Sequence, residues 1–199
     1  MKKHIKLSLG CGNKFFSAKD GWVNVDFDTP SNPVEGLVSL GELSLEKLEE
    51  YKDIAGIFFI EDDITTLKKI PDDSIQEILC IHAFEHIYLH QLETLFTNWK
   101  RVLKKGGTIT IESPDIIKCC INTLNLLSIE DPNVYLHAGL RAIYGGTEGM
   151  DEAKLHKWGW CFKTLRPVVE GYGFTNITES PALTHYKEQR DFRLTAAKG

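Results

Sequence analysis

Segments with strand character alternate with segments of helical character along this chain. Five runs are apolar, or alternate between apolar and polar residues, and are followed by turn residues: 4–10, 21–27, 54–62, 75–82 and 107–114. Between the last two runs, residues 90–107 place apolar side chains at helical spacing and end on a pair of glycines. Strands that alternate with helices predict an α/β fold, in which a mostly parallel sheet has helices on both faces.

The remaining segments carry weaker signals. Leucines at helical spacing predict a helix over residues 39–51, and residues 161–174 predict a helix that contains Pro167. Residues 175–180 and 191–197 are interpreted as two final strands. The chain therefore ends, in this prediction, on a helix followed by a pair of strands.

Length and composition limit the classes of protein. A chain of 199 residues without internal repeats predicts a single domain over residues 1–199, in which the less regular residues 115–157 are an insertion. The net charge is −5 and the basic residues are scattered, which predicts no nucleic-acid partner. No apolar run reaches the roughly 18 residues of a membrane span. The N-terminus is interpreted as a strand rather than a signal peptide, and five cysteines without C-x-x-C spacing favour a reducing, cytoplasmic setting.

The stretch CIHAFEHIYLH contains His82-x-x-Glu85-His86. On a helix, His82 and His86 would share one face as zinc ligands, and Glu85 would be the general base of a peptidase. The strand prediction places His82 at the end of a strand, with a helix starting only afterwards. The two histidines then do not share a helical face, which disfavours a zinc peptidase.

Several ligand-binding residue types follow the predicted strands, and ligands of parallel sheets bind at the carboxyl ends of strands. After the first strand, Gly10 and Gly12 allow a tight turn and a close approach of the backbone to a ligand. After the second strand, Asp26 is placed to accept the hydrogens of a ribose diol. After the third strand, Asp62 or Asp63 can accept an amino-group hydrogen from a base.

Together these stretches resemble the class I S-adenosylmethionine-dependent methyltransferases, and among them the compact methyltransferase type 11-like group that carries GWVNVD. The matching stretches run in the family's order from Leu7 to Phe174: LSLGCGN, GWVNVDFD, DDITTLKKIPDDSIQEILCIHAFEHI, WKRVLKKGGTITIESPD and HKWGWCFKTLRPVVEGYGF. The resemblance implies S-adenosyl-L-methionine as the cofactor. It also implies a Rossmann-like, doubly wound, seven-stranded sheet with an antiparallel C-terminal hairpin and helices on both faces.

The resemblance further implies how the cofactor lies across the strand ends. The glycine turn runs under its methionine part, Asp26 holds the ribose hydroxyls, and Phe27 packs on the adenine. One of two neighbouring aspartates meets the adenine edge with the backbone of Ile64, and His82 lies beside the methionine end. The residues implied to bind the cofactor are therefore Gly10, Cys11, Gly12, Asp26, Phe27, Asp62, Asp63, Ile64 and His82.

Methyl transfer requires alignment of the acceptor, and a hydroxyl acceptor also requires a general base. His86, one helical turn past the strand end, is the first candidate for this catalytic base, and His156 in LHKWGW is the second. A histidine that only orients the loop is the structural alternative for His86. His137 and Tyr144 lie in the same segment as His156 and are further candidates to cover the reaction site.

A metal site is an alternative that the resemblance leaves open. Small-RNA 2′-O and ubiquinone-pathway methyltransferases carry E-x-x-E-H at this place and bind a divalent ion. Here His82 replaces the first glutamate, and His137 or His156 would complete a site with Glu85 and His86. Imidazole ligands favour zinc or another transition metal over magnesium. We predict no metal ligand and keep this alternative.

The predicted activity is O-methylation of a small molecule or of a sugar or glycan hydroxyl, with residues 115–157 covering the substrate. The N/D-P-P-Y signature of amino-group methyltransferases is absent after the fourth strand, where HAFE stands. Similar compact chains accompany glycan synthesis. The alternatives are a non-catalytic S-adenosylmethionine-binding module and an NAD(P)-binding oxidoreductase. The oxidoreductase is disfavoured because Phe15 replaces the third glycine of the dinucleotide pattern and no Y-x-x-x-K occurs.

Overall fold

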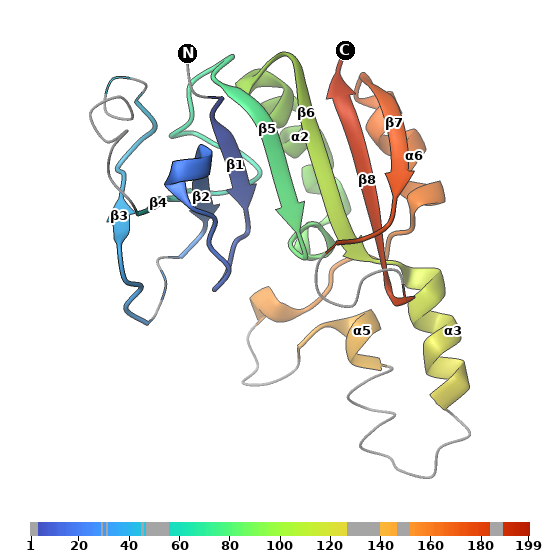
Figure 1. Ribbon diagram of the computed structural model, residues 1–199. Coiled ribbons are helices and arrows are strands. Elements are labelled where there is room, and N and C mark those ends of the chain that lie inside the picture. The colour runs from blue at the N-terminus through green and yellow to red at the C-terminus, as the bar shows by residue number, and fades with distance from the viewer. Residues whose placement is uncertain are drawn as a thin grey trace.

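One sheet forms the centre of the protein. The computed structural model describes residues 4–28, 30, 32–44, 46, 56–126, 140–146, 152–183 and 189–199. The sheet has eight strands in the order β3-β4-β2-β1-β5-β6-β8-β7 (Figure 1). The strands are β1 (Lys6–Leu9), β2 (Trp22–Asp26), β3 (Leu37–Ser39), β4 (Ile57–Glu61), β5 (Ile75–Ile81), β6 (Leu103–Pro114), β7 (Phe174–Ser180) and β8 (Asp191–Lys198). The helices are α2 (Leu92–Val102), α3 (Ile116–Leu126), α5 (Arg141–Tyr144) and α6 (Phe162–Gly171), with the 3₁₀ turns η1 (Ala18–Asp20), η2 (Phe84–His86), η3 (Leu89–Gln91) and η6 (Glu152–Lys154).

The pairing of the strands is parallel except at β8. β1 lies between β2 and β5, with Leu7 in register with Val23 on one side and Ile78 on the other. The pairs from β3 across to β6 are all parallel, whereas β8 runs antiparallel to both β6 and β7. The expected α/β, Rossmann-like sheet with an antiparallel C-terminal hairpin is therefore confirmed.

The strand count is a correction, because the sheet has eight strands where seven were expected. The additional strand is β3, which pairs in parallel with β4 at the edge of the sheet. The helix predicted over residues 39–51 is wrong at its start, since its first residue belongs to β3 and residues 40–44 are loop. Leu40 and Leu43 are buried from this loop, and their N–H groups donate to carbonyls of neighbouring segments. Their spacing therefore reflects core packing of a loop, and residues 47–51 lie outside the residues that the structure describes.

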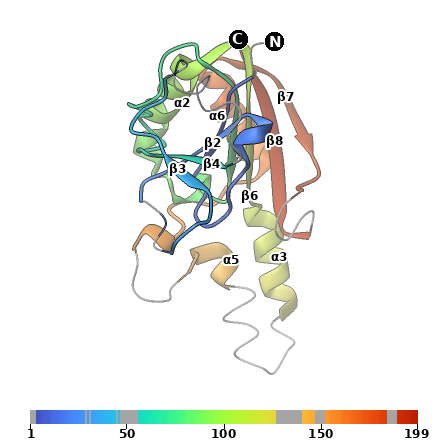
Figure 2. The same ribbon diagram turned by 60° about the vertical axis from the view of Figure 1, so that its left-hand side comes forward.

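One face of the sheet carries the main hydrophobic core. Leu7 and Leu9 on β1 and Ile109 on β6 point to this face, where α2 and α6 cover the sheet (Figure 1, Figure 2). Trp99 of α2 is fully buried there, and its Nε1–H donates to the carbonyl of Ile64, 2.9 Å away. Truncating a buried aromatic side chain costs about 3–5 kcal/mol. The same side chain thus stabilises the core and holds the loop that follows β4.

The opposite face of the sheet is more polar. Ser8, Asn24, Thr110 and Thr195 lie across it on neighbouring strands. The Asn24 side chain accepts a hydrogen bond from the Phe16 N–H and donates one to the Phe16 carbonyl, both at 2.9 Å, which holds the segment before η1 on this face. The described connection from β1 to β2 contains η1 as its one helical turn.

The described part of residues 115–157 lies beyond the carboxyl ends of the parallel strands. α3, α5 and η6 extend below the sheet in both views (Figure 1, Figure 2). α5 packs against α3. The described helices include none that is long and apolar enough to cross a membrane. The fold therefore builds a separate layer next to the edge where ligands of parallel sheets bind.

Candidate active site

The glycine turn after β1 has a backbone that favours glycine at two positions. Gly10 has φ +63° and Gly12 has φ +51°, both in the left-handed region. A Cβ atom on Gly10 would lie 2.3 Å from the Cβ of Ala83, so the turn packs directly against the residue that follows His82. No described atom lies within 4 Å of a Cβ on Gly12, which leaves that side of the turn open for a ligand.

Asp26, at the end of β2, is oriented by the glycine turn. Its Oδ2 accepts the Gly12 N–H and its Oδ1 accepts the Phe27 N–H, each at 2.7 Å. A carboxylate has about four lone-pair sites, so both oxygens can still accept the hydrogens of a diol. The Phe27 ring is 69% exposed, which leaves its face available to a flat ligand. Burial, and then the charge of Asp26, raises the pKa of the Cys11 thiol to about 12, so Cys11 is a neutral thiol here.

In the loop after β4, the two candidate aspartates differ in their hydrogen bonds. Asp62 is buried and uses both oxygens inside the loop, accepting the N–H groups of Asp63 at 2.9 Å and Lys69 at 2.8 Å. Asp63 accepts the N–H and the hydroxyl of Thr65 through the same oxygen, Oδ1. Oδ2 of Asp63 is therefore the better placed acceptor for a ligand, and Ile64 lies next to it against the glycine turn.

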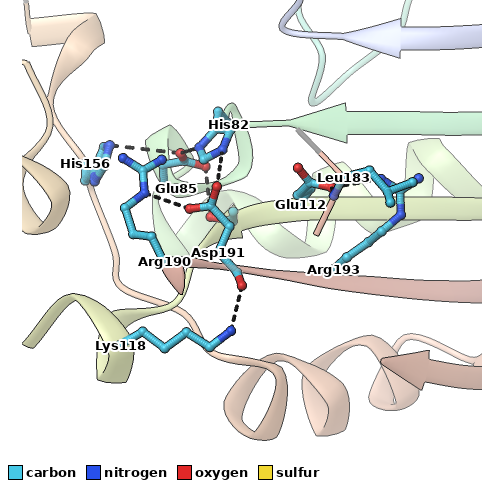
Figure 3. Close-up of polar contacts among 10 residues, drawn as sticks. His82, Glu85, Glu112, Lys118, His156, Leu183, Arg190, Asp191 and Arg193 are labelled. Carbon is cyan, nitrogen blue, oxygen red and sulfur yellow. Dashed lines mark hydrogen bonds and ion pairs between the residues drawn. The ribbon is translucent and has the colours of Figure 1, made fainter. Parts of the chain in front are cut away.

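His82 directly follows β5 and has a left-handed conformation, φ +50°. Its Nδ1 lies 3.2 Å from Glu85 Oε1, and its Nε2 lies 3.1 Å from Asp191 Oδ2 (Figure 3). Burial lowers the pKa of His82, but the hydrogen bonds to Asp191 and Glu85 outweigh burial and raise the pKa to about 9. His82 is therefore an imidazolium at neutral pH that donates to both carboxylates. The ring is held toward η2 and β8, whereas Ala83 faces the glycine turn.

Glu85 is a buried carboxylate at the centre of the site. Its Oε2 accepts the Ser113 hydroxyl at 2.9 Å, and its Oε1 faces His82. Burial raises the pKa of Glu85, but the hydrogen bond and charge of His82 outweigh burial and lower it. Glu85 is therefore ionised, and its Oε1 lies 3.9 Å from Nε2 of His156. The sequence had indicated Glu85 as the general base of the disfavoured peptidase and as a potential metal ligand.

Asp191 belongs to this candidate site, and the sequence did not indicate it. It is the first residue of β8, it is completely buried, and its Oδ1 accepts the Arg190 Nε–H at 2.7 Å. Burial raises the pKa of Asp191, but hydrogen bonds to His82 and Arg190 outweigh burial and lower it. Lys118 of α3 donates to its carbonyl at 2.8 Å (Figure 3). Its proximity to His82 arises from sheet pairing, which no local sequence signal predicts.

His86 and His156 lie against each other beside Glu85. Their ring centroids are 5.0 Å apart and nearly perpendicular. His86 Nδ1 lies 3.0 Å from the carbonyl of Leu155, so this hydrogen bond assigns a proton to Nδ1. Burial is the main cause that lowers the pKa of His156, so this ring is neutral at pH 7. The predicted catalytic residues are thus brought together, and His137 lies outside the residues that the structure describes.

A cleft of about 1050 Å³ opens over these side chains. His82, Glu85, His86 and His156 line one part of it, and residues of α3, α5 and the turn before β8 line the rest. Of the residues expected to contact the cofactor, His82 is the one that lines this cleft. Because Ala83 touches the glycine turn while His82 lines the cleft, the two regions adjoin at β5.

Comparisons with known proteins agree with this fold. Residues 32–111 match the family model described as a methyltransferase domain. The match covers less than half of the chain and is consistent with the resemblance to class I methyltransferases. The compact GWVNVD group stays a prediction, and no curated protein matches the sequence.

Solved structures of methyltransferases share the fold of this chain. One is an S-adenosylmethionine-dependent methyltransferase from Archaeoglobus fulgidus, with 17% identity over 99% of this chain and 87% of that chain and a TM-score of 0.56. Another is the Burkholderia thailandensis 1,6-didemethyltoxoflavin-N1-methyltransferase with bound S-adenosylhomocysteine, with 11% identity over 99% of this chain and 72% of that chain and a TM-score of 0.59. At these identities, the likeness shows the fold.

The Burkholderia structure holds S-adenosylhomocysteine, and the strand ends of this chain fit a ligand of that chemistry. The open left-handed turn at Gly12 suits a ligand chain that the protein backbone contacts. The oriented carboxylate of Asp26 suits a ribose diol, and the exposed ring of Phe27 suits a purine. A dinucleotide-binding fold places the N-terminus of a helix after β1 against the pyrophosphate. Among the described residues, η1 is the one helical turn between β1 and β2, which disfavours the dinucleotide alternative.

Proposed function

We propose that this protein methylates a hydroxyl group of a small molecule or of a sugar, with S-adenosylmethionine as the methyl donor. The observation that best supports this proposal is the position of His156, a neutral histidine that lines the cleft. Its Nε2 lies 3.9 Å from Oε1 of the ionised Glu85. A hydroxyl acceptor requires removal of a proton, and a neutral imidazole next to a carboxylate suits that task.

In this proposal, the strand ends hold the cofactor. The turn from Gly10 through Cys11 to Gly12 lies under the methionine part, and Asp26 accepts the ribose hydroxyls. Phe27 covers the adenine, while Asp63 Oδ2 and the Ile64 backbone meet its edge, with Asp62 bracing the loop. When bound, S-adenosylmethionine supplies an electrophilic methyl group on a sulfonium.

The side chains of the cleft then remove the hydroxyl proton of the acceptor. The acceptor oxygen bonds to the methyl carbon as the carbon–sulfur bond breaks, and the hydroxyl proton passes to His156 Nε2. Glu85 stabilises the imidazolium that forms, because its carboxylate is held ionised and oriented by His82 and Ser113. His86 packs on the His156 ring and is the alternative base. The products are a methyl ether, S-adenosylhomocysteine and a proton.

Formation of S-adenosylhomocysteine from a panel of hydroxyl compounds and sugars tests this function. A general base typically contributes about 10²–10⁴-fold. We expect His156→Ala to lower kcat by about 10²-fold or more and His86→Ala to lower it less, with cofactor affinity unchanged in both. His90→Ala is the matched control, because His90 is exposed and does not line the cleft. Equal turnover in all three variants would exclude the histidines as bases, and cofactor binding without turnover on any acceptor would favour the non-catalytic module.

A second candidate role for the same residues is divalent metal binding. One ligand atom from each of Glu85, His86 and His156 lies within 4.8 Å of the others. The hydrogen bond from His86 Nδ1 to Leu155 is the outer contact that orients histidines at metal sites. Calorimetric titration of chelator-treated protein with Zn²⁺ or Mn²⁺ tests this role. Stoichiometric binding that His86→Ala abolishes, with activity restored only by the metal, would favour it over the general base.

A further inference from the structure

Two arginines from distant parts of the chain line the same cleft. Arg141 begins α5, and Arg190 directly precedes β8. Neither takes part in the proton transfer proposed above. The chain as a whole is acidic, with a net charge of −5, yet two guanidinium groups line this one cleft. We therefore asked which ligand chemistry suits them.

Arg190 is held in place by both its backbone and its side chain. Its carbonyl accepts the Asp115 N–H at 2.9 Å, and its Nε–H donates to Asp191 at 2.7 Å. The neighbouring Gln189 carbonyl accepts a hydrogen bond from the Asn122 side chain of α3 at 3.2 Å. A guanidinium fixed at Nε is oriented before any ligand arrives, which lowers the entropic cost of binding.

Arg141 is positioned by the turn that also positions His156. The N–H of His156 donates to the Tyr144 carbonyl at 3.0 Å, and the N–H of Gly146 donates to the Lys154 carbonyl at 3.0 Å. A Cβ on Gly145 would lie 2.3 Å from the Lys154 carbonyl oxygen, so only glycine fits between these two segments. This close pairing fixes the spacing between the first residue of α5 and the proposed base.

Among the described residues at the cleft, cationic groups outnumber carboxylates. Two guanidiniums, Arg141 and Arg190, and the protonated His82 line the cleft together with Glu85, and Asp191 pairs with both Arg190 and His82. Amide side chains that can donate hydrogen bonds lie among them: Asn122, Asn125 and Gln189. The charge of Arg190 is one of the causes that lower the pKa of His156, so this guanidinium lies close to the proposed base. Figure 3 shows the Arg190 side chain extending alongside Asp191 toward His82 and His156.

We propose that the acceptor carries an oxyanion, a phosphate ester or a carboxylate, which Arg141 and Arg190 hold while its hydroxyl faces His156. This inference rests on the proposed function and adds the substrate class to it. Guanidinium forks match the geometry of phosphate and carboxylate oxygens, and charge-assisted hydrogen bonds of this kind are about twice as strong as neutral ones. Holding the anion at one end of the cleft positions the hydroxyl at the other.

Anion binding to the protein saturated with S-adenosylhomocysteine tests the proposal, since the cofactor site is then filled. The probes are pyrophosphate, inorganic phosphate and citrate, followed by calorimetry. We expect saturable binding that Arg141→Gln weakens by at least tenfold and that Arg141→Lys, which keeps the charge but loses the fork, weakens by less. Arg166→Gln is the matched control, because Arg166 lies exposed on α6 outside the cleft. Binding of the phosphates alone assigns a phosphate ester, and binding of citrate alone assigns a carboxylate.

Absence of saturable binding of all three anions would overturn the proposal, as would equal affinities of wild type and Arg141→Gln. The same titrations without S-adenosylhomocysteine separate this failure from failure of the proposed function. If S-adenosylhomocysteine does not bind while Arg141-dependent anion binding persists, the methyltransferase function fails and the anion site stands. If S-adenosylhomocysteine binds and no anion does, the reverse holds.

Discussion

His82 Nε2 lies 3.1 Å from Asp191 Oδ2, although 109 residues separate the two in the chain. The contact forms because β5 and β8 both pair with β6, which brings the end of one strand next to the start of the other. It joins Arg190, Asp191, His82 and Glu85 into one buried chain of alternating charge. This chain holds the carboxylate next to which the proposed general base lies.

Asp191→Asn tests this chain. The asparagine keeps the shape of the side chain but removes the charge that faces His82 and Arg190, and breaking a buried ion pair costs about 3–5 kcal/mol. We expect a loss of about 3 kcal/mol in the free energy of unfolding in urea and a fall in the pKa of His82 measured by NMR on chelator-treated protein. The control is Asp20→Asn, an exposed aspartate on η1. An unchanged His82 pKa would contradict the role of Asp191.

The stability of the protein should depend on pH through the same histidine. The pKa of His82 is raised from 6.5 in the unfolded chain to about 9 in the folded protein. The stabilisation is therefore fully present below pH 6.5 and is lost as pH rises through about 9. We expect the free energy of unfolding of the wild type to fall by about 3 kcal/mol across this window and that of Asp191→Asn to fall less. Parallel curves for the two proteins would contradict the assignment.

Two alanine substitutions in the glycine turn distinguish the cost of backbone strain from the cost of steric overlap with Ala83. Both Gly10→Ala and Gly12→Ala place a Cβ on a left-handed residue, which costs about 1–2 kcal/mol. Only the first Cβ meets another atom, the Ala83 Cβ at 2.3 Å. We expect Gly12→Ala to lose about 1–2 kcal/mol and Gly10→Ala about 3–5 kcal/mol in urea unfolding. Equal losses would show that the turn does not pack on Ala83 as described.

The protonation of His156 gives a prediction about the pH dependence of activity. Burial and the charge of His86 lower the pKa of His156, whereas Glu85 raises it. We expect the acidic limb of kcat/KM to lie below the ordinary histidine pKa of 6.5. Glu85→Gln should move that limb to still lower pH, because it removes the carboxylate that stabilises the imidazolium. A limb that moves to higher pH in this variant would contradict the pairing of Glu85 with His156.

The site residues that the sequence indicated are those whose positions depend on residues nearby in the chain. Gly10 and Asp26 follow strands, and their roles depend on turns that the neighbouring residues form. Asp191 could not be found in this way, because an acid at the start of a strand resembles a surface acid until the sheet is assembled. The edge strand β3 was missed for a related reason. Its three residues are too few to show an alternating pattern, and the buried leucines after it have helical spacing.

The pairing of His82 likewise depends on the assembled sheet. The sequence placed it correctly at the end of a strand, and the resemblance implied a place beside the cofactor. The structure directs its ring toward two carboxylates, one from β8 and one from η2. Whether it also contacts the methionine end stays a prediction. The three residues His82, Glu85 and His86 thus act in one cluster, although they do not share a helical face.

Binding of S-adenosylhomocysteine to ligand-free protein, measured by calorimetry, tests the central claim most directly. We predict one site per chain, and Asp26→Ala should weaken binding by about 2 kcal/mol, roughly 30-fold, because hydrogen bonds to a charged partner are worth about that much. Asp28→Ala, an exposed aspartate two residues further on, should bind as the wild type does. No binding to the wild type, or equal affinity of Asp26→Ala and wild type, would contradict the placement of the cofactor at these strand ends.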